Sequence, residues 1–179
     1  MGVLFALCCI NFSAQALAEP TEYEAKAAYV INFARYVNWP ASDAPEPSAP
    51  MHICVLGNDP LSETLERALN GRTSNGRPMV MRHLRQVGET TGCQLLLIIQ
   101  SAERHQALWL PLLQSKPILT VGESERFIRD GGIINLVIVK GTVRFEVNLE
   151  AANRAGLKIS SRMLGLAEAV YGKPEESAK

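Results

Sequence analysis

Five consecutive apolar residues, Leu95 to Ile99, constrain the fold of this chain more than any other feature of its sequence. A run of this length is short for a helix and contains no polar residue, which is typical of a β-strand buried on both faces. Such a strand needs a packing layer on each side of its sheet. The surrounding sequence therefore has to supply helices for both sides.

Helical and extended segments alternate around this run. We predict helices at 21–38, 60–69, 103–113 and 124–128, and strands at 53–56, 79–84, 95–99 and 118–121. Thr21 and Glu24 match a capping box at the first helix, and Asp59 with Pro60 favours a helix start. The alternation predicts an α/β fold, a single three-layer domain with a mostly parallel or mixed sheet flanked by helices.

The last third of the chain has a different pattern. Predicted strands at 133–139 and 142–149 flank Lys140-Gly141, which favours a tight C-terminal β-hairpin. In the second strand the apolar residues Val143, Phe145, Val147 and Leu149 alternate with Arg144, Glu146 and Asn148. This alternation predicts one buried and one solvated face. Further helices are predicted at 150–155 and from Ser160 or Ser161 toward Val170.

The first 18 residues are typical of a secretory signal peptide. Val3 to Phe12 is an apolar run interrupted by Asn11, and Ala16-Leu17-Ala18 is a small-residue cleavage site. The run is shorter than the ~20 residues that span a bilayer. No Lys or Arg precedes Lys26, from which we infer a basic segment upstream; a buried first helix is the alternative. We expect an export segment at 1–18, one domain at 19–179 and a periplasmic location.

Removal of the export segment leaves two of the four cysteines, Cys54 and Cys93. In an oxidising compartment an even pair of cysteines predicts a disulfide. Two buried free thiols are the alternative.

Composition and motifs argue against several classes of function. Lys plus Arg and Asp plus Glu number 18 each, so no whole-chain charge attracts nucleic acid. Nucleophile, phosphate-binding and dinucleotide-binding motifs are absent, His52 and Cys54 share a strand face without a third ligand, and Glu123 and Glu125 are spaced like surface charges. We therefore expect no catalytic residue, no cofactor, no metal site and no nucleic-acid partner.

One basic cluster stands out in the sequence; it comprises Arg72, Arg77, Arg82, His83 and Arg85. We interpret it as a solvated strand face or as a surface for an acidic partner.

The solvated face of the last strand provides a candidate partner-binding patch. Arg144 and Glu146 lie on that face, and Arg154 follows nearby in the sequence. These charges could form oriented ion pairs with another protein. Solvated structural charge is the alternative interpretation.

An ordered set of sequence blocks covers nearly all of the chain after residue 18. The blocks are Tyr23 to Tyr29, Asn32-Phe33, Trp39-Pro40, Ile53 to Gly57, Leu119 to Gly122, Gly131 to Asn135, Val143 to Leu149 and Ala155 to Ser161. Taken together, this ordered set is more specific than any single block, and it resembles the YfiR family.

The resemblance implies a soluble, non-catalytic periplasmic regulator that tends to form homodimers. Such proteins repress an inner-membrane diguanylate cyclase through its periplasmic domain, which lowers cyclic di-GMP and biofilm formation, and an outer-membrane peptidoglycan-binding lipoprotein releases them. Cys54 and Cys93 match the family's first cysteine pair, whereas Ile128 and Asn135 stand in the region where some members have a second pair.

A function of another class would use the same fold differently. A periplasmic small-ligand-binding protein, feeding a sensor or a transporter, would bind its ligand in the cleft at the ends of the parallel strands. In this sequence that cleft would lie near Gly57 and Gly122.

Overall fold

A computed structural model describes residues 20–40 and 49–172 of this protein. The predicted signal peptide at 1–18, with Cys8 and Cys9, lies outside the described residues. None of the helices within the described ranges is both long and apolar enough to cross a membrane.

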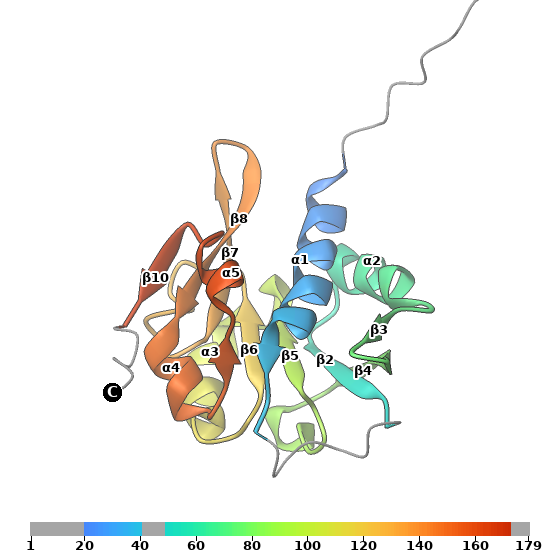
Figure 1. The fold of residues 1–179 in the computed structure, drawn as a ribbon, viewed down its shortest axis with the longest axis horizontal. Helices are drawn as coiled ribbons and strands as arrows, with labels where there is room; N and C mark the ends of the chain where they lie inside the picture. Colours follow the sequence, from blue (N-terminus) through green and yellow to red (C-terminus); the bar gives the residue numbers. More distant parts are fainter. Residues whose placement is uncertain (1–19, 41–48, 173–179) are drawn as a thin grey trace, which may run out of the picture.

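An eight-stranded mixed sheet forms the centre of the domain. Its strand order is β10 (Ala169–Tyr171), β8 (Thr142–Asn148), β7 (Ile134–Val139), β6 (Leu119–Gly122), β5 (Leu95–Ile98), β2 (Met51–Leu56), β4 (Arg77–Leu84) and β3 (Thr73–Ser74). The strands from β7 to β4 run parallel, whereas β8 is antiparallel to β7 and β3 to β4. Figure 1 shows β10 at one edge of the molecule and β3 at the other.

Helices cover both faces of this sheet, so the predicted three-layer α/β fold is confirmed (Figure 1). One face packs against α1 (Glu22–Tyr36), α2 (Pro60–Leu69), α4 (Leu149–Arg154) and α5 (Ser161–Leu164). The other packs against a connection made of η3 (Gln100–His105), α3 (Gln106–Trp109) and η4 (Leu110–Leu113). Outside these layers lie η2 (Val87–Glu89) and a small antiparallel pair, β1 (Val37–Asn38) with β9 (Lys158–Ile159).

Local sequence signals place most of these elements. Thr21 and Glu24 form the predicted capping box of α1, and the Asp59 carboxylate accepts hydrogen bonds from the first N–H groups of α2. At the β7–β8 hairpin Lys140 and Gly141 both have positive φ, 50° and 77°, which gives a turn whose twist suits two antiparallel strands. The predicted C-terminal hairpin is thereby confirmed.

One predicted helix is shorter than expected, and another is wrong. The helix expected from Ser160 toward Val170 ends at Leu164 as α5, and the chain continues into β10, because Ala169 to Tyr171 pair with β8. The helix expected at 124–128 is a turn, in which Phe127 accepts a hydrogen bond from the Gly132 N–H. In both cases contacts with the sheet override local helix propensity.

Candidate functional site

An ion-pair cluster lies at the carboxyl ends of the parallel strands. Lys26, on the first turns of α1, places its Nζ 2.6 Å from a carboxylate oxygen of Glu22 and 2.6 Å from Glu123 Oε2. Glu123 directly follows β6, and its Oε1 accepts the N–H of Gln100, which follows β5. The side chains of Lys26 and Glu123 are each 9% exposed, so the pair is almost fully removed from water. The expectation that Glu123 is a surface charge is therefore wrong.

The environment of this cluster shifts two pKa values. Burial disfavours the Lys26 ammonium, but its hydrogen bonds to Glu123 and Glu22 outweigh that cost and raise the pKa of Lys26. Burial is also the main cause that raises the pKa of Asp59, against the hydrogen bonds that its carboxylate accepts from Ser62 and Leu61. The cluster thus holds Lys26 protonated and ties α1 to the end of β6.

Side chains of the protein fill the strand-end positions that could have formed a ligand cleft. A Cβ added at Gly122 would lie 2.2 Å from the Phe127 ring, and one at Gly132 would lie 2.1 Å from it, because the ring packs between these two glycines. At Gly57 an added Cβ would lie 2.6 Å from side-chain atoms of Ile99 and Ser101. These glycines make room for packing inside the domain.

A polar cavity of about 520 Å³ lies beside the same strand ends. One of its lining residues is Gln106, which is 5% exposed and is fixed by hydrogen bonds with Ser124 and Asp130. Charged residues of both signs line its remainder, among them Glu103, Arg104, Glu125 and Arg126. Among the described residues no group of three or more His, Cys, Asp or Glu side chains could hold a metal ion.

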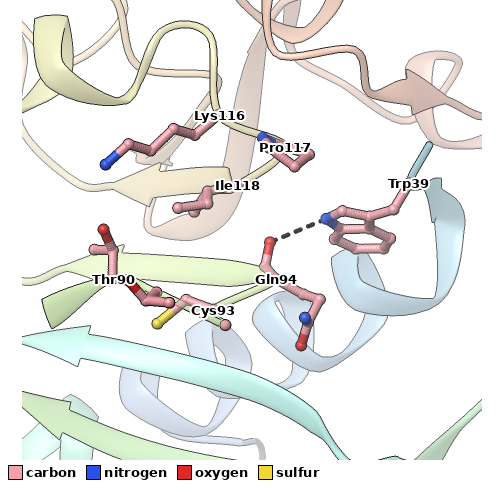
Figure 2. Close-up of a pocket in the computed structure, with 9 residues that line it drawn as sticks. Trp39, Thr90, Cys93, Gln94, Lys116, Pro117 and Ile118 are labelled. Atoms are coloured by element: carbon pink, nitrogen blue, oxygen red, sulfur yellow. Dashed lines mark hydrogen bonds between the residues drawn. The ribbon is translucent and has the colours of Figure 1, made fainter. Parts of the chain in front are cut away.

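A disulfide lies near the opposite end of the parallel strands. The structure joins Cys54 of β2 to Cys93, just before β5, with their Cα atoms 5.9 Å apart, as the sequence led us to expect. Cys93 also lines a cavity of about 270 Å³ together with Trp39 and Lys116 (Figure 2). The Trp39 indole donates a hydrogen bond to the Gln94 carbonyl at 3.2 Å, as Figure 2 shows.

The three residues predicted to form the partner patch have different environments in the structure. Arg144 is exposed on β8, and Arg154 is exposed on α4, where it pairs with Glu150 at 2.6 Å. The Glu146 carboxylate is engaged within the domain, where it accepts hydrogen bonds from Asn135 at 3.3 Å and from the Tyr171 hydroxyl at 3.0 Å. Donation to this carboxylate raises the pKa of Tyr171. No described contact joins any two members of the patch.

Other candidate residues have structural contacts. In the basic cluster, Arg77 donates to the carbonyl groups of Ala49 and Pro50, and Arg82 to that of Thr91. His52 and Cys54 share a sheet face as predicted, but Cys54 is in the disulfide. Burial and the two arginines lower the pKa of His52.

Sequence analysis missed Lys26, although its position carried a signal. Lys26 precedes Val30 by four residues and Phe33 by seven, so it occupies the apolar stripe of the helix. A lysine at such a position needs a partner when it is buried. No comparable signal pointed to Glu123 or to Gln94, because their burial depends on the packing of distant segments.

Solved structures share this fold at low sequence identity. One is described as an ABC domain in complex with L-Trp from Streptococcus pneumoniae, with 12% identity, a TM-score of 0.59 and coverage of 80% of this chain. Another is a conserved domain protein from Vibrio cholerae, with 12% identity, a TM-score of 0.52 and coverage of 83% of this chain. The chain spans 60% of the length of each of these proteins, and the likeness concerns the fold alone.

The sequence also matches a known protein family over most of its length. The model of the family described as YfiR/HmsC-like matches residues 23–168, from the start of α1 to the residue before β10. Proteins of this family are periplasmic, and they act through partner proteins as regulators in cyclic di-GMP signalling. The chain belongs to the YfiR/HmsC-like family.

Proposed function

We propose that this protein is a periplasmic regulator that represses an inner-membrane diguanylate cyclase by binding its periplasmic domain. Repression lowers cyclic di-GMP and biofilm formation. The family match over residues 23–168 is the observation that carries the proposal. The signal peptide at 1–18 would export the chain and be cleaved there, and the exported domain would act as a homodimer.

Repression of this kind requires only that the regulator bind two conformations of the cyclase with different free energies. A regulator shifts the cyclase toward its inactive conformation if it binds that conformation more tightly, and a tenfold preference corresponds to about 1.4 kcal/mol. An outer-membrane peptidoglycan-binding lipoprotein would relieve repression by competing for the regulator. Arg144 and Arg154 are the exposed charges that we propose as partner contacts. We propose Glu146 as the third residue of this patch; its carboxylate accepts hydrogen bonds from Asn135 and Tyr171.

Deletion of the gene tests this function. We expect cyclic di-GMP and cell aggregation to rise in the deletion strain and to return to normal when the full chain is supplied. A version without residues 2–18, as the matched control, should fail to restore repression because it is not exported. Cyclic di-GMP that stays unchanged in the deletion strain would refute the proposal.

A second candidate function is the binding of a small polar ligand. The cavity of about 520 Å³ beside β5 and β6 favours it, because α/β sheets bind ligands outside the carboxyl ends of their strands. A ligand at about 100 times its Kd would stabilise the domain by about 2.7 kcal/mol, which a thermal-shift screen of amino acids and sugars would detect. A shift that Ser124→Trp abolishes would support this function, and no shift with any compound would count against it.

A further inference from the structure

The edge of the sheet formed by β8 and β10 lacks a neighbouring strand along much of its length. β10 pairs only with Glu146 to Asn148 of β8. No described strand lies beside the first part of β8, Thr142 to Arg144, on the side away from β7. The described sheet therefore ends in a stepped edge. Its outermost strand is β8 from Thr142 to Arg144, and farther along β8 it is β10 (Figure 1).

Two backbone hydrogen bonds establish which main-chain groups point outward along this edge. Asn148 donates its N–H to Ile133, on the β7 side, whereas Phe145 accepts the N–H of Glu168, on the β10 side. Because successive residues of a strand alternate in direction, Val143 also directs its N–H and C=O groups away from β7. Nothing in the described part of the chain pairs with them.

The same alternation applies to β10. Glu168 directs its backbone toward β8, so Val170 does too, and Ala169 and Tyr171 direct their N–H and C=O groups outward. Val143, Ala169 and Tyr171 thus offer a row of main-chain donors and acceptors.

The opposite edge of the sheet is protected by side chains, whereas the described residues of β10 carry no such protection. At β3 the Arg35 guanidinium donates to the Thr73 carbonyl, and the Ser74 hydroxyl donates to Ala34 of α1. Proteins commonly protect sheet edges with charged residues or proline, and Ala169-Val170-Tyr171 contains neither.

Apolar side chains are exposed around the open edge. Leu166 is 66% exposed, Val170 41% and Tyr171 44%. Arg144 is exposed on the part of β8 that β10 does not cover, without a described ion-pair partner. The nearest acidic residue on its strand face, Glu146, already accepts hydrogen bonds from Asn135 and Tyr171. The surface therefore combines free main-chain groups, apolar contacts and one available positive charge.

We propose that the β8–β10 edge binds an extended segment of a partner protein, which joins the sheet as an additional strand. Main-chain hydrogen bonds would supply affinity, and alternate side chains of the segment would supply specificity. The surface fits a segment with apolar residues at alternate positions and an acidic residue beside Arg144. The identity of the partner, the periplasmic domain of the cyclase, rests on the proposed function.

Two substitutions test the edge without removing a predicted patch residue. Ala169→Pro removes an outward N–H while leaving the hydrogen bonds to β8 in place, a position at which edge strands tolerate proline. Val170→Lys puts a charge on the exposed side chain of the same strand and keeps every main-chain group. Leu108→Lys, at a 71% exposed residue of α3, is the matched control for the loss of exposed apolar surface.

Each variant is expressed in the deletion strain, and its binding to the purified periplasmic domain of the cyclase is measured. We expect Ala169→Pro to weaken binding about fivefold by losing one main-chain hydrogen bond, and to raise cyclic di-GMP. Val170→Lys should act in the same direction, Leu108→Lys should behave as the unmodified chain, and all three should melt close to it. Addition of the cyclase domain should also slow amide exchange at Val143, Ala169 and Tyr171, but not at β3.

The outcomes separate this inference from the proposed function. If the unmodified chain restores repression and both edge variants do so equally well, the edge proposal is wrong while the function stands. Loss of a homodimer in Ala169→Pro with full repression would assign the edge to self-association and would also overturn the proposal. If Ala169→Pro fails to fold, Val170→Lys and the exchange measurement decide the question.

Discussion

At the scale of single residues, the Lys26–Glu123 pair is the most consequential contact that the structure adds to the sequence. It joins α1 to the end of β6 across 97 positions of sequence and buries two charges that satisfy each other. Such a pair contributes little net stability relative to an apolar pair, but removing one partner leaves the other charge buried and uncompensated.

We therefore predict that Lys26→Ala lowers the free energy of unfolding by about 3 kcal/mol, measured by urea denaturation. Glu22, the other partner of Lys26, is itself a carboxylate and cannot neutralise Glu123. The double variant Lys26→Met with Glu123→Gln should regain part of that stability, because it removes both charges. A single variant as stable as the unmodified chain would show that water reaches Glu123.

At the scale of elements, the sequence correctly predicted the strands and turns whose conformation depends on a local residue pattern. The apolar run at Leu95 identified the central strand, and Lys140-Gly141 identified the hairpin. The turn around Phe127 was mistaken for a helix because the ring packs between Gly122 and Gly132, and local helix propensity does not take that packing into account. β10 was missed because three residues form a strand only where β8 is there to pair with them.

The packing of Phe127 leads to a prediction about Gly122. We expect Gly122→Ala to destabilise the domain by about 3 kcal/mol, because the added methyl group would lie 2.2 Å from the ring and well-packed cores tolerate little added volume. Gly88→Ala is the matched control: an added Cβ there has no neighbour within 4 Å, so the change should stay within about 0.5 kcal/mol.

Urea denaturation measures both variants. Combining Gly122→Ala with Phe127→Leu should recover stability relative to Gly122→Ala alone, because a smaller side chain makes room for the methyl group. If Gly122→Ala were as stable as Gly88→Ala, the ring would not occupy the space between the glycines.

At the scale of the whole molecule, sequence blocks identified the family, whereas the partner patch was predicted from one strand and a nearby helix and stays a prediction. Arg144, Glu146 and Arg154 were grouped because they are close in sequence and polar. In three dimensions Glu146 is used by Tyr171 of β10, a strand that was predicted as part of a helix. The partner surface that we propose depends on which strand ends the described sheet, and that is a property of the topology.

The disulfide also acts at this scale, because it closes a loop of 39 positions that contains α2, β3 and β4. On the chain-entropy account such a bridge stabilises the fold by about 4 kcal/mol. For a domain of this size that corresponds to a fall in Tm of about 10 °C on reduction.

We predict that calorimetry with and without dithiothreitol will measure this fall in Tm, and that Cys54→Ser will lower the Tm by a similar amount without reductant. The double variant Cys54→Ser with Cys93→Ser should have one Tm in both buffers, which shows that the reductant acts only through the bridge. A Tm that does not change after full reduction, verified by thiol counting, would mean that packing of β2 against β5 alone holds the loop in place.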